Sequence, residues 1–334
     1  MTTQTNRRVL LADMPAGKLG VEHFRMDEAP MPVAVDGEVL VRVLYLSLDA
    51  ANRAWMQGAT YRAAVGSGDV MAGHSLAEVV SSRAAGFAPG DLVLADSGWQ
   101  QYAALPAAGL RKLPRVEPVT HLLSVFGIAG LTAYFGLLEA GRPKASDTVV
   151  VSAAAGSVGS LVGQIAKLKG CTVVGIAGGQ AKCDLLTREL GFDAAVDYKS
   201  PTFFKALKAA APKGIDVYFD NVGGEVFEAC LFQMNLHGRI ACCGAVSQYD
   251  GKPPAHGPRG VPGLIVTKRL SLQGFILYDF MHRMDEALTD LRQWVADGRI
   301  RVREDILDGL ERAPAGLVGL LAGENVGKRM VRVG

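Results

Sequence analysis

Cysteine is scarce in this chain and unevenly placed. The 334 residues include 5 Cys, all of them between Cys171 and Cys243, so the first half of the chain has none. An odd number of cysteines without paired spacing argues against a disulfide framework and predicts a reducing compartment, the cytoplasm. No C-x-x-C sequence occurs, which excludes a four-cysteine zinc lobe.

An excess of one charge sign and a long hydrophobic run are also missing. Lys and Arg number 35 against 33 Asp and Glu, a net charge of +2, so the sequence predicts neither a nucleic-acid partner nor an anionic membrane surface. Two stretches without charged residues, 118–138 and 148–166, contain glycine and hydroxyl side chains. They fit buried segments of an enzyme better than membrane spans. The first 13 residues lack a long apolar run, so no secretory signal is expected.

The pattern that is present changes near residue 120. Before it, short strands separated by Gly and Pro are expected at 39–46, 79–80 and 92–94. After it, helical patterns alternate with apolar strands at 148–151, 171–176, 194–198, 215–220, 238–244 and 270–277. This alternation predicts a parallel doubly wound α/β sheet. We expect two domains, 1–122 joined by the tail 300–334, and a nucleotide-binding unit at 123–299.

The strand at 148–151 runs into a turn of small residues and then into a helix, the context of a dinucleotide-binding fingerprint. Ala154 stands at the first glycine position. Gly156 would let the backbone approach a pyrophosphate, and Gly159 would let helix and strand pack closely. The helix N-terminus would attract the pyrophosphate. A glycine turn without ligand is the alternative, which the six alternating strands disfavour. The expected cofactor contacts are Ala155, Gly156, Ser157, Val158 and Gly159.

The next strand favours NADP(H) over NAD. An NAD site places Asp or Glu about 20 residues after the glycines, where it binds the ribose 2′-hydroxyl. Here the sequence from Ile176 to Lys182 contains no acid, and the first one is Asp184. Lys182 would supply a cation for a 2′-phosphate. The alternative is an exposed lysine in the first turn of a helix.

Several segments carry a resemblance to a known family. They lie at 131–137 (LTAYFGL), 153–160 (AAAGSVGS), 164–171 (QIAKLKGC), 191–199 (GFDAAVDYK), 219–225 (FDNVGGE), 273–277 (QGFIL) and 324–328 (ENVGK). The chain resembles the zinc-independent medium-chain dehydrogenase/reductases, in the group of prostaglandin/alkenal double-bond reductases that includes the curcumin reductases. The resemblance implies a GroES-like β-rich barrel domain, a Rossmann domain and an active site between them. It also implies a cytosolic homodimer that reduces the C=C bond of α,β-unsaturated aldehydes and ketones with NADPH.

The resemblance also implies roles for individual residues. Lys182 and Tyr198 would hold the 2′-phosphate, and Asn221 would approach the cofactor after the fourth strand. Asn325 would reach the nicotinamide side from the tail. Further cofactor contacts are expected at Gly178, Gly244, Phe275 and Leu277.

Zinc is not expected. Zinc-dependent relatives carry a Cys in the first domain and a Gly-His-Glu motif, whereas here 47–52 has no Cys and His74 is followed by Ser75. We therefore predict no metal site and a cleft-wall role for His74. Many members of the group also have Pro-Tyr-Met-Arg where this chain has Ala51 in place of the aromatic residue. Trp55 and Tyr61 lie close enough in sequence to compensate.

The implied reaction places a hydride on the β-carbon and develops negative charge on the carbonyl oxygen. An enolate needs hydrogen-bond donors, and the α-carbon needs a proton. The candidates are Tyr278, Tyr61, Tyr249 and the ribose hydroxyls of the cofactor. Tyr278 is favoured because it follows the matching segment at 273–277. For each tyrosine the alternative is a packing residue whose hydroxyl binds backbone or water.

Two other functions stay open at this stage. A quinone oxidoreductase of the same superfamily would share the fold and the cofactor. A protein that binds NADPH without turnover would keep the same phosphate loop. The sequence does not name the physiological substrate, and it predicts only a small-molecule enone or alkenal.

Overall fold

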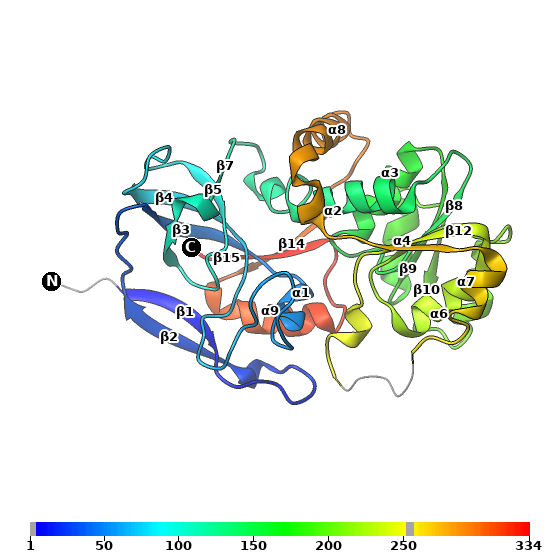
Figure 1. The fold of residues 1–334 in the computed structure, drawn as a ribbon, viewed down its shortest axis with the longest axis horizontal. Coiled ribbons are helices and arrows are strands. Elements are labelled where there is room, and N and C mark those ends of the chain that lie inside the picture. Colours follow the sequence, from blue (N-terminus) through cyan, green and yellow to red (C-terminus); the bar gives the residue numbers. More distant parts are fainter. Residues whose placement is uncertain (1–4, 252–256) are drawn as a thin grey trace.

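The computed structural model describes residues 5–251 and 257–334. Figure 1 shows two sheets side by side, with α8 above and α9 below the region between them. A two-stranded antiparallel ribbon, β1 (Thr5–Leu11) and β2 (Phe24–Pro30), flanks the first sheet. This mixed α/β architecture, β-rich in the first part and parallel in the second, confirms the predicted fold class.

The first sheet has the strand order β14-β15-β3-β4-β5-β7, and β6 pairs with β3. Alternate residues of β3 (Val39, Val41 and Val43) are at most 1% exposed, so one face of this strand forms core. β15 pairs with β3 antiparallel, with Val331 opposite Leu46. The end of the chain thus joins the sheet that its beginning forms. The remaining bounds are β3 (Glu38–Ser47), β4 (Ser75–Ser82), β5 (Leu92–Ala95), β6 (Tyr102–Pro106), β7 (Arg111–Leu113), β14 (Glu304–Asp308) and β15 (Lys328–Arg332).

The second sheet has six parallel strands in the order β10-β9-β8-β11-β12-β13. The order reverses between β8 and β11, and ligands of such sheets collect at the carboxyl ends of the strands beside this point. The strands are β8 (Thr148–Val151), β9 (Thr172–Ala177), β10 (Ala194–Asp197), β11 (Ile215–Asp220), β12 (Met234–Cys242) and β13 (Ser271–Gly274).

The helices follow the strands of the second sheet and close the ends of the first. The α-helices are α1 (Ala51–Ala54), α2 (Ile128–Phe135), α3 (Gly159–Leu168), α4 (Gln180–Arg188), α5 (Phe203–Ala210), α6 (Gly224–Gln233), α7 (Gly263–Lys268), α8 (Met284–Ala296) and α9 (Ala313–Leu321). Shorter helical turns are η1 (Val21–His23), η2 (Ala107–Gly109), η3 (Val119–Leu122), η4 (Gly136–Gly141), η5 (Val246–Gln248), η6 (Leu277–Arg283) and η7 (Leu310–Arg312).

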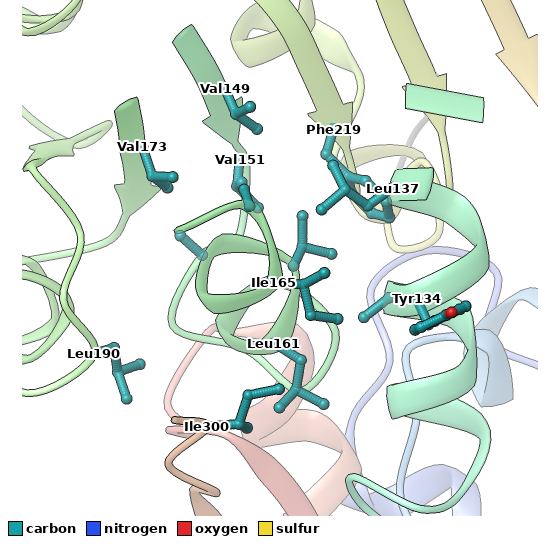
Figure 2. Close-up of a cluster of buried hydrophobic side chains, with 14 of the residues drawn as sticks. Tyr134, Leu137, Val149, Val151, Leu161, Ile165, Val173, Leu190, Phe219 and Ile300 are labelled. Carbon is teal, nitrogen blue, oxygen red and sulfur yellow. The ribbon is translucent and has the colours of Figure 1, made fainter. Parts of the chain in front are cut away.

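The two charge-free stretches are core. Val149 and Val151 of β8 face Leu161 and Ile165 of α3 in one hydrophobic cluster (Figure 2), while Val150 belongs to a second cluster on the opposite face. Burial on both faces explains why β8 reads as a continuous apolar run. In the part of the chain that the structure describes, no helix has the length and apolarity needed to cross a bilayer.

The last predicted strand is shorter than its sequence suggested. β13 ends at Gly274, and Leu277 already begins η6. Phe275 turns into the interior, where its ring lies 6.1 Å from that of Phe219. The ring fills the space that a side chain at Gly136 would need, with Cε1 2.8 Å from an ideal Cβ there. The backbone is still extended at Ile276, so what ends at Gly274 is the pairing with β12.

A test of the helix–sheet packing comes from Gly163 in α3. The ring of Phe192, which is 3% exposed, occupies the position of a Cβ at Gly163 and lies 3.0 Å from a Cβ at Gly175. Because the ring is confined between two glycines, we expect Gly163→Ala to reduce the free energy of unfolding by about 1–3 kcal/mol. Urea denaturation measures this.

Gly263→Ala in α7 is the matched control, because no heavy atom lies within 4 Å of a Cβ there. We expect it to change stability by less than about 1 kcal/mol. Equal stability of Gly163→Ala and the wild-type protein would contradict the packing argument.

Candidate active site

The loop between β8 and α3 has a specific backbone form. Ala153 adopts a left-handed conformation with φ +48°. It directly precedes Ala154, which stands at the position of the first glycine of the fingerprint. Ala154 itself is fully buried. A Cβ at Gly159 would lie 2.9 Å from the Cα of Ala154 and overlap the carbonyl of Ala153. Gly159 therefore permits the close approach of helix and loop expected for the third glycine.

A cavity of about 590 Å³ lies along this loop, and we call it the glycine-loop cavity. Its wall includes twelve of the residues singled out from the sequence: Ala155, Gly156, Ser157, Val158, Gly159, Gly178, Lys182, Tyr198, Asn221, Gly244, Tyr249 and Asn325. Phe275 and Leu277 do not line it and lie in a neighbouring cavity instead. The cavity opens at the carboxyl ends of β8, β9 and β11, beside the point where the strand order reverses.

The C-terminal tail closes one side of the glycine-loop cavity. The N–H of Gly327 donates to the carbonyl of Ala155 at 2.8 Å, and Gly327 forms a parallel bridge with Gly156. The side-chain amide of Asn325 donates to the carbonyl of Gly327 at 2.9 Å. The segment before β15 therefore belongs to the wall of this site.

Cations gather at one end of the cavity. Nζ of Lys182 donates to the carbonyls of Gly323 at 2.6 Å and of Asn325 at 2.7 Å. Burial, together with the nearby charge of Lys199, lowers the pKa of Lys182. A Cβ at Gly178 would lie 3.1 Å from Cε of Lys199, so Lys199 stands beside a glycine of the cavity wall. The residue-by-residue reading of the sequence missed Lys199, although it directly follows Tyr198.

An acid next to Lys199, Asp197, is already occupied by backbone N–H groups. Asp197 ends β10, and its carboxylate accepts the N–H groups of Gly179 and Lys199, each at 2.9 Å. These backbone hydrogen bonds hold the pKa of Asp197 below its ordinary value. The Asp197 carboxylate thus binds backbone N–H groups of the turns after β9 and β10 and not the side chains of Lys182 and Lys199. These two ammonium groups can therefore bind an anion.

The end of β11 is tied to the glycine loop. The side-chain amide of Asn221 donates to the carbonyl of Ser152 at 2.7 Å, and the Asn221 N–H donates to Oγ of Ser152 at 2.9 Å. Asp220 accepts the hydroxyl of Tyr218 at 2.6 Å and the N–H of Gly223 at 2.9 Å. This network holds Asn221 rigidly at the cavity wall.

The residues present fit a phosphorylated dinucleotide. The hydroxyl of Ser157 is buried, yet it has no hydrogen-bond partner within residues 5–251 and 257–334. Buried polar atoms almost always have partners, so this hydroxyl is available to a ligand. Ser157 stands just before α3, whose N-terminal N–H groups favour an anion. The two lysines add positive charge at the end where the sequence predicts the 2′-phosphate.

A second cavity of about 620 Å³ adjoins the first, and we call it the tyrosine cavity. It shares Asp49, Ala51 and Cys243 with the glycine-loop cavity. The rings of Tyr61 and Tyr278 lie 5.7 Å apart in it. Nε1 of Trp55 donates to the hydroxyl of Tyr61 at 3.2 Å, which leaves the Tyr61 proton free for another acceptor. Burial raises the pKa of both tyrosines, so both hydroxyls are protonated at neutral pH.

Tyr249 is separated from the other two candidates. It lines the glycine-loop cavity, and its hydroxyl accepts the N–H of Ala245 at 3.2 Å. Gln57 donates to its carbonyl at 2.9 Å. The next residue, Asp250, forms an ion pair of 3.1 Å with Arg53, whose side chain is only 4% exposed. These contacts attach the segment after β12 to α1.

His74 lines the tyrosine cavity with its ring 6.1 Å from that of Trp55. Burial lowers its pKa. Outside the undescribed residues 1–4 and 252–256, which include His256, no three His, Cys, Asp or Glu side chains gather in a way that would hold a metal ion. His74 therefore stands in an aromatic setting, as a wall residue.

A buried ion pair lies where the two cavities meet, and sequence reasoning missed it. Nζ of Lys328 is 2.5 Å from Oδ1 of Asp49, and the hydroxyl of Ser47 donates to Oδ2 at 2.5 Å. Burial raises the pKa of Asp49, but the charge and hydrogen bonds of Lys328 and the hydrogen bond of Ser47 outweigh it and hold the pKa below its ordinary value. The partners are 279 residues apart, so no local pattern signals the pair.

Comparisons with known proteins show which family the chain is similar to. A sequence family described as the N-terminal domain of oxidoreductase matches residues 7–113, and one described as zinc-binding dehydrogenase matches residues 157–293. The NADPH-dependent curcumin reductase of Escherichia coli (strain K12) is 45% identical over 99% of this chain and 97% of that protein. Prostaglandin reductase 1 of Bos taurus is 44% identical over 92% of this chain and 93% of its own length.

A solved structure extends the likeness to three dimensions. CurA from Vibrio vulnificus in complex with NADPH is 42% identical and superposes with a TM-score of 0.94, covering 98% of this chain and 99% of that one. Identity at this level over nearly the whole length exceeds what a shared fold alone requires. The chain belongs to the zinc-independent medium-chain dehydrogenase/reductases, in the group that contains the curcumin and prostaglandin reductases.

Proposed function

We propose that this protein is an NADPH-dependent reductase of the C=C bond of α,β-unsaturated ketones and aldehydes. The observation that carries the proposal is the pair of cavities that meet at Asp49, Ala51 and Cys243. The glycine-loop cavity has the loop and the cationic end that suit NADPH. The tyrosine cavity has phenolic donors that suit a carbonyl oxygen. The likeness to the curcumin reductase and to the 2-alkenal reductase (NADP(+)-dependent) of Nicotiana tabacum supports the same assignment.

The cofactor would be held by the wall of the glycine-loop cavity. Lys182 and Tyr198 of the wall, with Lys199 beside Gly178, would bind the 2′-phosphate. The N–H groups of 155–159 and the Ser157 hydroxyl would bind the pyrophosphate. Asn221, Gly244 and Asn325 complete the wall. NADPH, when bound, supplies the hydride for the β-carbon of the substrate. In this proposal the domain formed by residues 123–299 binds the nucleotide. The other domain, formed by residues 1–122 and 300–334, contributes Tyr61 and Asp49.

The tyrosine cavity would orient the enone. Tyr61 and Tyr278 can each donate a hydrogen bond to the carbonyl oxygen, where negative charge develops. The Trp55 N–H holds the Tyr61 hydroxyl so that its proton is directed away from Trp55. Tyr249 is a third donor from the other cavity, and Phe275 with Leu277 forms part of the apolar wall. Water or one of these hydroxyls would then supply a proton to the α-carbon of the enolate.

The cysteine at the boundary between the cavities is suited to such a substrate. Enones react with thiolates, and Cys243 lies where the double bond would stand. Burial raises the pKa of Cys243 to about 12. The thiol therefore stays protonated and is a poor nucleophile toward the substrate.

We further propose a homodimer in the cytoplasm. β13 is the last strand of the parallel sheet, and its outer edge is unpaired within the chain that the structure describes. Such an edge can pair with that of a second copy. All five cysteines are free thiols, which fits a reducing compartment. Size-exclusion chromatography with light scattering checks the dimer.

The reaction class is tested by NADPH oxidation with a panel of enones and a panel of quinones. We expect turnover of enones, with the saturated ketone as product. Retention of the carbonyl in the product, established by mass spectrometry and NMR, distinguishes C=C reduction from carbonyl reduction. Preferential turnover of quinones would instead identify the protein as a quinone oxidoreductase. NADPH binding without turnover of any substrate would identify it as a non-catalytic NADPH-binding protein.

Lys182→Ala tests the cofactor choice. Loss of the charge that faces the 2′-phosphate should raise the KM for NADPH by roughly 10–100-fold, since hydrogen bonds to charged groups contribute about 1.5–3 kcal/mol. The KM for NADH should change much less. Lys182 also binds two backbone carbonyls, so a purely structural role would raise both constants together and would contradict the assignment.

Three Tyr→Phe variants test the donors. We expect Tyr278→Phe to lower kcat for an enone about 100-fold, the scale of one lost donor at a developing oxyanion, while the Kd for NADPH changes little. Tyr61→Phe should act in the same direction. If Tyr278→Phe keeps full turnover and Tyr249→Phe loses it, the donor is Tyr249.

A further inference from the structure

One arginine of the tyrosine cavity has no ion-pair partner among the residues that the structure describes. Arg111 begins β7, the edge strand of the first sheet, and its side chain lines the cavity. Nε of Arg111 is buried and has no hydrogen-bond partner in the described parts of the chain, and the guanidinium forms no ion pair with any described residue. Its Nη1 donates to the sulfur of Met284, a weak acceptor.

The acidic groups around the cavity are already neutralised. Asp49 pairs with Lys328, and Asp96 pairs with Arg62 at 3.1 Å. His74 is kept neutral by burial. From α8, Asp285 exerts an attractive field on Arg111 but is exposed and makes no ion pair with it. Arg111 therefore brings a positive charge to the cavity wall that no ion pair within residues 5–251 and 257–334 neutralises.

An unpaired guanidinium that is partly withdrawn from water is unfavourable unless a ligand compensates it. The planar fork of arginine matches a carboxylate, which can accept two parallel N–H···O bonds. The wall around Arg111 otherwise offers apolar side chains, among them Leu94, Leu110, Ile128 and Leu131, which suit a hydrocarbon chain. The cavity thus combines an apolar wall with one anion-binding group.

We propose that Arg111 binds a carboxylate at the far end of the substrate, so that the preferred substrates are enones with an anionic tail. The inference rests on the proposed function, because it assigns the double bond to the boundary between the two cavities. Asp49, Ala51 and Cys243 mark that boundary, and Arg111 is not one of the residues that the cavities share. The reacting bond and the carboxylate would occupy different parts of one elongated cavity.

The test compares enones that end in a carboxylate with their methyl esters, over a series of chain lengths. For the wild-type enzyme we expect kcat/KM for the acid to exceed that for the ester by at least tenfold at the best length. Arg111→Gln should bring this ratio close to one, and Arg111→Lys should keep part of it. Raising the salt concentration should lower the ratio for the wild-type enzyme.

Lys112→Gln is the matched control. It removes the same charge from the next residue of β7, whose side chain is exposed and pairs with Asp91 at 2.7 Å. Neighbouring side chains of a strand point to opposite faces, so this variant should keep the wild-type ratio of acid to ester. A similar drop in both variants would show a general effect of net charge and would overturn the proposal.

A binding measurement separates this inference from the proposed reaction. Trp55 lines the cavity, so its fluorescence can report the binding of a saturated keto acid and of its methyl ester. For the wild-type protein we expect a lower Kd for the acid than for the ester. For Arg111→Gln we expect the two Kd values to be equal. An acid-to-ester ratio that Arg111→Gln leaves unchanged overturns the role of Arg111. Failure to reduce any enone overturns the proposed function instead.

Discussion

The ion pair between Lys328 and Asp49 holds together the parts of the molecule on which the site depends. Lys328 is 3% exposed, and a lysine so far from water needs its charge compensated. Asp49 supplies the countercharge, and the carbonyl of Leu48 accepts a further hydrogen bond at 3.1 Å. The pair fixes β15 to the segment between β3 and α1. Because Gly327 precedes Lys328 and binds the glycine loop, the same strand also attaches the first sheet to the second.

This arrangement explains why the two cavities meet at Asp49. Oδ1 of its carboxylate pairs with Lys328, Oδ2 accepts the hydroxyl of Ser47, and the residue lines both cavities. The glycine-loop cavity is lined by the loop 155–159, by Ser157, whose hydroxyl has no partner in the described chain, and by Lys182, whereas the tyrosine cavity is lined by aromatic rings and phenolic hydroxyls. The proposed sites for the dinucleotide and for the substrate carbonyl are therefore separate but adjoining. The Arg53–Asp250 pair adds a second connection across the same boundary.

Much of the fold could be predicted because its signals are local. Continuous apolar strands with small-residue turns and helical stripes are readable in short windows, and the six predicted strands of the parallel sheet are all present. The prediction was less accurate at 270–277, where the strand stops at Gly274. No local propensity shows that Phe275 packs into the space left by Gly136, since the two residues are far apart in sequence.

The sequence by itself determined the fold class, the place of the glycine loop, the lack of an acid after the second strand of the parallel sheet and the family. Each of these depends on residue types at fixed short spacings. Only the tertiary structure decided which side chains share a cavity. It placed Tyr249 in a different cavity from Tyr61 and Tyr278, packed Phe275 against Gly136, and left Arg111 without an ion-pair partner among the described residues. Those outcomes depend on contacts between distant segments, whose energies come from burial and charge pairing, and no short stretch of sequence contains both partners.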